Sequence, residues 1–154
     1  MIRILFVCLG NICRSPMAEC IFLHLAREAG VADAFAVDSA ATSREELGNP
    51  IYPPARRQLQ SHGVACPDHR ARQIQKQDYG RFDYIIAMER SNIRPILAIT
   101  GGDPEGKVSR LLDHTPQGGD VADPWYTGDF DAAWRDIHTG CTALLRELRQ
   151  RHHI

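Results

Sequence analysis

The sequence lacks the features that mark a nucleic-acid-binding or membrane protein. Neither charge is in excess, since 18 Lys and Arg stand against 19 Asp and Glu in 154 residues. Without a basic stretch to hold a phosphate backbone, we expect no nucleic acid partner. The longest apolar run, Ile4 to Leu9, is far too short to cross a bilayer. We therefore expect no membrane insertion and a small or locally charged substrate.

The sequence also lacks internal repeats, low-complexity segments and a secretory signal at its N-terminus. Its five cysteines are an odd number in a chain too large to need disulfide bonds, which favours reduced thiols and a cytoplasmic location. A hydrophobic content of 44% fits an ordinary core. We expect a single domain over residues 1–154, present as a monomer or a weak dimer.

Apolar runs and helical spacing alternate along the chain. Ile2 to Val7 predicts a strand buried on both faces, followed by a helix with Ser15 as N-cap, Pro16 in its first turn and Gly30 at its end. Further strands are predicted at 35–40, 84–88 and 108–112, and further helices at 55–61, 93–99 (capped by Ser91) and 130–151. This order predicts an α/β fold, namely a three-layer domain with an open four-stranded parallel sheet flanked by helices, of the flavodoxin or Rossmann type.

The segment CLGNICRS, Cys8 to Ser15, lies between the first predicted strand and the first predicted helix. Ligands bind at this end of the strands in open α/β sheets, and a helix N-terminus with free backbone N–H groups attracts an anion. Gly10 allows the loop to curl, Asn11 tolerates the left-handed conformation, and Arg14 can hold two phosphate oxygens at once. We expect an anion site here.

Cys8 would place its sulfur in this anion site. The helix N-terminus and Arg14 favour the thiolate form of the side chain. Taken alone, a cysteine at the end of a buried strand is more often a packed apolar residue. The order of Cys, five residues, Arg and Ser between a strand and a helix instead indicates a nucleophile held against phosphorus.

Cys-x5-Arg-Ser is the phosphate-binding signature of the cysteine-dependent phosphatases, and VCLGNICRSP resembles the low-molecular-weight protein tyrosine phosphatases in particular. Further segments resemble the same family, in the same order, along nearly the whole chain. They are VDSAATS at 37–43, HRARQI at 69–74, FDYIIAMERSNIRPI at 82–96 and DPWY at 123–126. The resemblance implies an enzyme that hydrolyses phosphotyrosine in proteins, and small aryl phosphates, through a phosphocysteine intermediate.

The resemblance also implies residue roles. Cys8 is expected to be the nucleophile, Arg14 with the loop amides the phosphate clamp, and Asp123 the general acid and later the general base. Substrate contacts are expected from Leu9, Gly10, Asn11, Ile12, Cys13, Glu45, Trp125 and Tyr126, with the two aromatic residues forming walls for the phenyl ring. Phosphate or other oxyanions should inhibit by occupying the same loop. No metal and no cofactor are expected.

Residues behind the loop are expected to support it. Asn11, Ser39 and His69 match family positions that hydrogen-bond together there, although a histidine such as His69, taken alone, is more often a surface or a satisfied residue. Ser15 is positioned to hydrogen-bond the Cys8 sulfur, although a role as helix N-cap alone would also account for it.

Cys13 has two interpretations. The resemblance implies a reversible disulfide between Cys8 and Cys13 under peroxide, which would protect the nucleophile from over-oxidation. A free thiol in the loop wall is equally compatible with the sequence alone. Cys20, Cys66 and Cys141 are expected to be structural.

Two positions depart from the family pattern. Glu45, beside Glu46, stands where eukaryotic relatives usually have an aromatic or other variable residue. If both line the entrance, the substrate preference should move away from acidic peptides. Glu89 stands where an aspartate is more usual after the methionine.

The main alternative is a thioredoxin-coupled arsenate reductase, which shares the fold and the loop but needs two further cysteines close together in the central part of the chain. Only Cys66 lies there. A phosphocysteine carrier of sugar transport would lack Arg14. A phosphotyrosine-binding module without catalysis is disfavoured because Cys8, Arg14 and Asp123 are all present.

Overall fold

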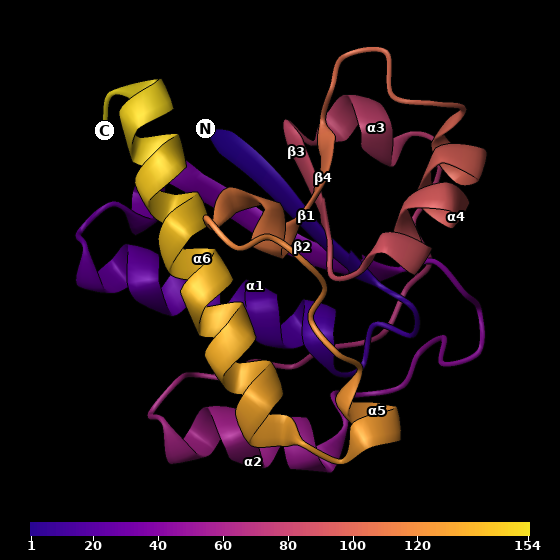
Figure 1. Cartoon of the computed structure of the whole chain (residues 1–154), viewed down its shortest axis with the longest axis vertical. Coiled ribbons are helices and arrows are strands. Elements are labelled where there is room, and N and C mark those ends of the chain that lie inside the picture. The colour runs from indigo at the N-terminus through magenta and orange to yellow at the C-terminus, as the bar shows by residue number, and fades with distance from the viewer.

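A computed structural model describes residues 1–154 as strands and helices in alternating order (Figure 1). The elements are β1 (Ile2–Cys8), α1 (Arg14–Glu28), β2 (Phe35–Ala41), α2 (Pro53–Ser61), α3 (Asp78–Arg81), β3 (Tyr84–Ala87), α4 (Arg90–Thr100), β4 (Val108–Arg110), α5 (Pro124–Thr127) and α6 (Phe130–His152). Short 3-10 helices, Ala32–Ala34 and Leu111–His114, precede β2 and follow β4.

The sheet confirms the predicted four parallel strands, in the order β2-β1-β3-β4. The central strand β1 pairs with β2 on one side and β3 on the other, with Cys8 opposite Ala41 and Val7 opposite Ala87. Its continuous apolar sequence is explained by burial on both faces. Because the strand order changes direction at β1, the carboxyl end of β1 is the point where such sheets bind ligands. Residues 9–13 leave the sheet at this point.

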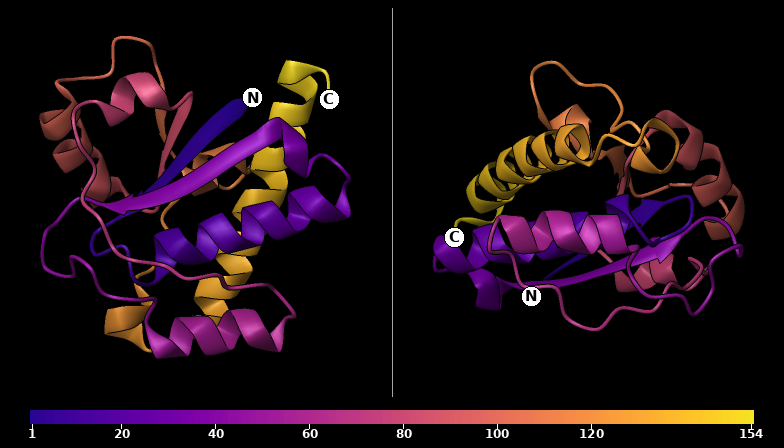
Figure 2. Two further views of the ribbon diagram at one scale, coloured as in Figure 1. Left: turned by 180° about the vertical axis from the view of Figure 1, so that it is seen from behind. Right: turned by 90° about the horizontal axis from the view of Figure 1, so that it is seen from below.

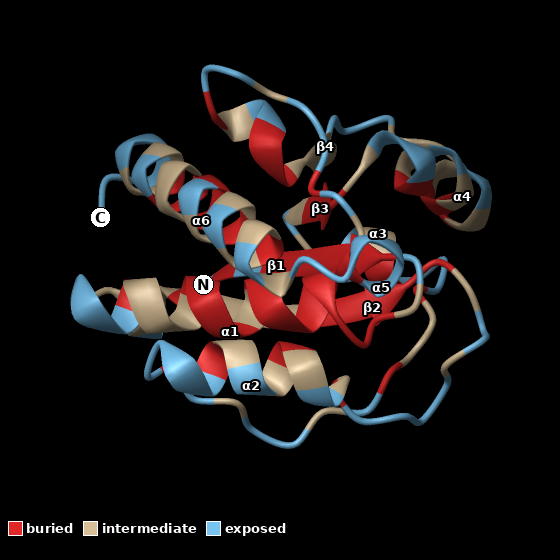
Figure 3. Ribbon diagram, turned by 60° about the horizontal axis from the view of Figure 1, so that its bottom comes forward, coloured by how far each residue is buried: buried red, intermediate tan, exposed pale blue.

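Helices cover both faces of the sheet (Figure 2). One face of β1, with Ile4 and Phe6, packs in the larger buried cluster with residues of α1 and α6. The other face, with Leu5 and Val7, packs in a second cluster with Ile96 of α4. Figure 3 shows that burial is concentrated in the sheet and in the sides of the helices that face it. This arrangement confirms the predicted three layers.

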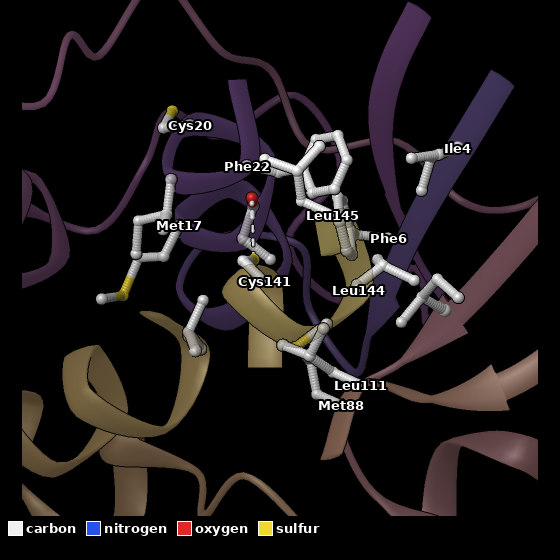
Figure 4. Packing of buried hydrophobic residues seen from close by; sticks show 14 of the residues in the cluster. Ile4, Phe6, Met17, Cys20, Phe22, Met88, Leu111, Cys141, Leu144 and Leu145 are labelled. Carbon is white, nitrogen blue, oxygen red and sulfur yellow. Dashed lines mark hydrogen bonds between the residues drawn. The ribbon is translucent and has the colours of Figure 1, made fainter. Parts of the chain in front are cut away.

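The long helix α6 is buried along one side only. In Figure 4 its Cys141 lies within the apolar cluster, with the thiol directed at the carbonyl oxygen of Ala18 in α1 at 3.7 Å. The residues of α6 on its other side are exposed or half-buried. No helix of the chain has both the length and the apolar character that crossing a membrane requires.

Two predicted helix caps are wrong, and tertiary contacts explain why. α1 begins at Arg14, not after Ser15, and has no side-chain cap. α4 begins at Arg90 with Glu89 as its N-cap, in a reciprocal capping box with Asn92. The hydroxyl of Ser15 is used inside the loop before α1, and that of Ser91 donates to Glu89. Neither hydroxyl therefore accepts a hydrogen bond from a free backbone N–H at the start of its helix.

Other element bounds differ from the prediction at their ends. The strand predicted to reach residue 112 ends at Arg110, because residues 111–114 turn into a 3-10 helix that packs on α6. α3 and α5 were not predicted. Each has four residues, which is too short for a hydrophobic period to be visible in the sequence.

The contact of α6 with the segment after β4 gives a stability prediction. A Cβ atom at Gly140 would lie 2.5 Å from Cγ of the buried Leu111, so Gly140→Ala must displace that side chain. We expect the free energy of unfolding to fall by about 1–3 kcal/mol, as overpacked cores do. Urea denaturation measures this. Gly80→Ala in α3 is the control, since its Cβ would meet no atom within 4 Å and stability should not fall; equal effects at the two sites would contradict the packing argument.

Candidate active site

The backbone of the loop between β1 and α1 has its carbonyl groups bonded to surrounding segments. The carbonyl oxygens of Cys8, Leu9, Asn11 and Ile12 accept from Thr42 N–H, Ser43 N–H, the His69 ring and Tyr52 N–H, at 2.9, 3.0, 2.6 and 2.8 Å. Segments that follow β2 and precede α2 and α3 thus hold the loop from outside. Since a carbonyl can only accept, Nε2 of His69 carries the proton in its bond to Asn11.

The backbone N–H groups of the loop are not used in this way. Those of Leu9, Gly10, Ile12 and Cys13 donate to no group of the chain, while the N–H of Asn11 donates to Sγ of Cys8 at 3.3 Å. Successive free amides in a curled loop form a nest that suits an anion.

The curl of the loop comes from one residue. Asn11 has φ of 60°, the left-handed conformation that the sequence led us to expect of it. Gly10 has no positive φ, so the curl does not use the backbone conformation that is particular to glycine. A Cβ at Gly10 would lie 3.4 Å from Cγ of Glu46, which is an ordinary contact.

Cys8 lies at the bottom of this loop with 3% of its surface exposed. The hydroxyl of Ser15 is 3.0 Å from its sulfur and accepts from Nδ2 of Asn11 at 2.8 Å. The other acceptor within reach of the Ser15 hydroxyl is the carbonyl oxygen of Ala40, at the longer distance of 3.4 Å, so the hydroxyl proton points at the nearer sulfur. Ser15 and the N–H of Asn11 therefore give the sulfur two donors, which favour a negative charge on it.

Asn11 links the loop to the residues behind it. Its Oδ1 accepts from the N–H of Arg72 at 3.1 Å, in addition to the bond from His69 to its carbonyl. Burial lowers the pKa of His69, so the ring is neutral, in keeping with a single proton on Nε2. Ser39 does not contact the loop directly, because its hydroxyl donates to Oε1 of Glu19 on α1 at 2.7 Å.

Arg14 is the most buried charge of the site, with 1% of its surface exposed. Its Nη1 donates to Oε2 of Glu89 at 2.6 Å and to the carbonyl of Val121 at 2.8 Å, and its Nη2 lies 3.3 Å from Oδ2 of Asp123. The N–H of Val121 in turn bonds the carbonyl of Met88, just after β3. One guanidinium therefore joins the start of α1, the N-cap of α4 and the segment before α5.

Asp123, predicted from the resemblance of DPWY to the family's motif, lies in the same pocket as Cys8 although 115 positions separate them in the sequence. It is also the N-cap of α5, where its Oδ1 accepts from the N–H of Trp125 at 3.0 Å. This bond leaves Oδ2 directed to the pocket side, against Arg14. The short helix α5 therefore fixes the orientation of the carboxylate.

The pocket brings together every substrate-contacting residue that the sequence predicts, and adds Glu46. Trp125 and Tyr126 are half or more exposed at its edge. Tyr52, which sequence reasoning missed, has its ring centroid 4.8 Å from that of Trp125, with the two ring planes tilted by 55°. In the sequence, Glu89 stands out only as a departure from the family pattern. Its position one residue after Met88, at the end of β3, is the signal that would have placed it near the site. No group of three or more His, Cys, Asp or Glu side chains is placed to hold a metal ion.

Comparisons with known proteins show which proteins the chain resembles over nearly its whole length. The family model described as "Low molecular weight phosphotyrosine protein phosphatase" matches residues 3–153. The chain is 41% identical to low molecular weight protein-tyrosine-phosphatase YfkJ of Bacillus subtilis, over 97% of both chains. The crystal structure of YfkJ matches with a TM-score of 0.94, over 98% of this chain and 96% of that one. The human low molecular weight phosphotyrosine protein phosphatase is 38% identical, over 97% of this chain and 95% of its own length.

A cluster of charges lies behind the loop, around Glu19. Burial raises the pKa of Glu19 to about 7, with a further rise from Asp38 and opposing effects of the Ser39 hydrogen bond and of Arg72. Arg72 bridges Asp38 and Asp78, both at 3.0 Å. The cation that could compensate Glu19 is therefore already paired with two other carboxylates.

This cluster predicts a pH dependence of stability. The pKa of Glu19 rises from 4.5 to about 7 on folding, so the native state holds the proton more tightly than the unfolded state does. The contribution of Glu19 to the free energy of unfolding is therefore present in full below the pKa of the unfolded state, and it is lost as the pH rises through the pKa of the folded state. Between pH 4.5 and 7.5 the free energy of unfolding of the wild type should fall by up to about 3 kcal/mol relative to Glu19→Gln. Urea denaturation at several pH values tests this, and parallel profiles of the two proteins would contradict it.

Proposed function

Because the chain belongs to the low molecular weight phosphotyrosine protein phosphatase family, we propose that Cys8 is the nucleophile that removes phosphate from tyrosine side chains. In this proposal Arg14 and the loop amides bind the phosphate, and Asp123 is the general acid and base. The observation that carries the proposal is the loop itself. Its carbonyl groups are bonded outward, the N–H groups of Leu9, Gly10, Ile12 and Cys13 are free, and the N–H of Asn11 donates to the sulfur of Cys8.

The free donors of Arg14 support its role as the phosphate clamp. A guanidinium has five N–H donors. Three are taken by Glu89, Val121 and Asp123, which leaves the Nε–H and one Nη2–H. These two protons lie on one edge of the guanidinium plane and can bind two phosphate oxygens together. The ion pairs fix the other edge, so the guanidinium is oriented before the phosphate arrives.

The position of Asp123 supports its proposed role in both proton transfers. Its carboxyl lines the same pocket as the amide loop, within the space that the oxygen of the departing tyrosine would occupy. In the first step Cys8 attacks phosphorus, the bond from phosphorus to the tyrosine oxygen breaks, and Asp123 supplies the proton to that oxygen. In the second step Asp123 takes a proton from water, which attacks the phosphocysteine and releases phosphate and the thiolate. The Ser15 hydroxyl would stabilise that departing sulfur.

The depth of the pocket supports selection of aryl phosphates. Cys8 is nearly fully buried, and the rings of Trp125 and Tyr126 stand above it at the pocket edge. A phenyl ring between these walls would carry its phosphate down to the sulfur, whereas the shorter phosphoserine side chain would not reach as far. Inorganic phosphate and similar oxyanions should compete for the same amides and inhibit.

The mechanism predicts the behaviour of two variants. Cys8→Ser should form no phosphoenzyme and have no turnover. Asp123→Asn should lower kcat/KM, which reports the step that releases the phenol, by about 10²–10⁴ with phenyl phosphate, because the phenolate then leaves without a proton. The loss should be smaller with p-nitrophenyl phosphate, whose leaving group needs less protonation. Rapid-quench trapping and steady-state assays with both esters measure these effects.

The exposed Asp33, at the opposite end of the sheet before β2, supplies the control. Asp33→Asn should keep wild-type rates with both esters. Full turnover by Cys8→Ser would exclude the proposed nucleophile. An equal loss with both esters in Asp123→Asn would exclude Asp123 as the proton donor.

We assign a protective role to Cys13. Burial raises its pKa to about 12, with smaller contributions from the charges of Cys8 and Asp123, so it remains a thiol while Cys8 reacts with peroxide. Peroxide would convert the Cys8 thiolate to a sulfenic acid with release of hydroxide. The Cys13 thiol would then displace the oxygen as water and form a disulfide, which a thiol reductant can reverse.

A recovery experiment tests this role. After peroxide inactivation and treatment with dithiothreitol, the wild type should regain most of its activity. Cys13→Ala should regain several-fold less, because its sulfenic acid can proceed to the irreversible sulfinic acid. Cys66→Ala, a half-buried thiol outside the pocket, should recover like the wild type. Equal recovery of Cys13→Ala and wild type would contradict the protective role.

A further inference from the structure

The pocket has an unusual charge for a site that receives a phosphate dianion. Its lining contains one cation, Arg14, and three carboxylates, those of Glu45, Glu46 and Asp123. Arg14 is itself paired with Asp123 and with Glu89. The amides at the bottom attract the phosphate at short range, but Glu45 and Glu46 have no cationic partner in the structure. The side chains that line the pocket therefore carry a net negative charge.

The two glutamates are held close to the loop. The backbone just before them is tied to it, since Thr42 N–H and Ser43 N–H bond the carbonyls of Cys8 and Leu9. Glu46 accepts from Nδ2 of Asn49 at 2.6 Å and is half-buried, whereas Glu45 is exposed. These bonds hold the backbone of the segment beside the loop, and the bond from Asn49 restrains the carboxylate of Glu46.

The mouth of the pocket is also where the exposed large apolar residues gather. Apart from Met1 and Ile154 at the chain ends, the exposed large apolar residues are Leu9, Leu47, Trp125 and Tyr126. Leu9, Trp125 and Tyr126 line the pocket, and Leu47 directly follows Glu46. Figure 3 shows α5, which carries both aromatic residues, largely exposed in front of the buried end of the sheet. Apolar contact area and negative charge therefore occur on the same rim.

We propose that this rim, through Glu45 and Glu46, selects phosphotyrosine segments that carry Arg or Lys beside the phosphotyrosine and apolar residues around it. The inference rests on the proposed function and names its substrate class. A phosphotyrosine with acidic neighbours brings further negative charge to the two glutamates and is repelled. A basic neighbour pairs with them while the phosphate enters, so it offsets the repulsion between the rim and the phosphate.

The experiment compares two phosphotyrosine peptides of equal length and equal apolar residues, one with Arg and the other with Glu at the positions flanking the phosphotyrosine. For the wild type, kcat/KM should be roughly tenfold higher for the Arg peptide at low salt. The ratio should fall several-fold in 0.5 M NaCl, where charges are screened beyond a few ångströms. In Glu45→Gln/Glu46→Gln it should approach one, and in Glu45→Lys it should invert.

Asp33→Asn removes one negative charge far from the pocket and should leave the ratio at its wild-type value. A wild-type ratio near one, or a ratio that the glutamate variants do not change, would overturn the inference. Hydrolysis of p-nitrophenyl phosphate is measured for every protein in parallel. Its absence in the wild type would overturn the proposed function itself, whereas normal hydrolysis with an unchanged peptide ratio would overturn only the role of the rim.

Discussion

The buried guanidinium of Arg14 is the interaction on which the site depends. It lies at the start of α1 and pairs with Glu89 at the start of α4 and with Asp123 before α5, so three segments that are distant in the sequence share one charge. Removing one partner from a buried ion pair typically costs 3–5 kcal/mol, because the other charge is left uncompensated. The phosphate clamp and the carboxylate of the proton donor are thus positioned by the same contact. A change at Glu89 would reach the chemistry through Arg14 without touching the substrate.

The loop around Cys8 is held by neutral hydrogen bonds, in contrast to the ion pairs that hold Arg14. Asn11 adopts a left-handed conformation and makes bonds to Ser15, Arg72 and His69. Backbone strain of this kind costs about 1–3 kcal/mol and persists only where surrounding bonds determine the conformation. In this loop, neighbouring segments donate hydrogen bonds to the backbone carbonyl groups, while four of the backbone N–H groups stay free. A preorganised set of donors needs no rearrangement when charge develops on the phosphoryl oxygens.

In the proposed function, the groups that bind the phosphate therefore lie close to it, and the groups that select the substrate lie further out. Amides and one arginine edge act within hydrogen-bond range of the phosphate, while the glutamates act from the rim, where solvent weakens charge interactions. The strong short-range donors fit any phosphate ester that reaches them. In the proposals made above, Trp125, Tyr126 and the two glutamates of the pocket lining then select among these esters. These residues come from segments outside the loop, which can vary without altering the phosphate cradle.

The sequence by itself determined the parallel α/β fold, because continuous apolar strands alternate with amphipathic helices, and it located the anion site, because Cys8 to Ser15 is a local strand-to-helix segment. The resemblance to a family added Asp123. Only the tertiary structure decided that Ser15 bonds the sulfur instead of capping α1, that Ser39 bonds Glu19, and that Glu89 pairs with Arg14. Local patterns report the bonds a residue can make with its neighbours in the chain. When a distant partner competes for the same hydroxyl or carboxylate, the folded geometry decides which bond forms.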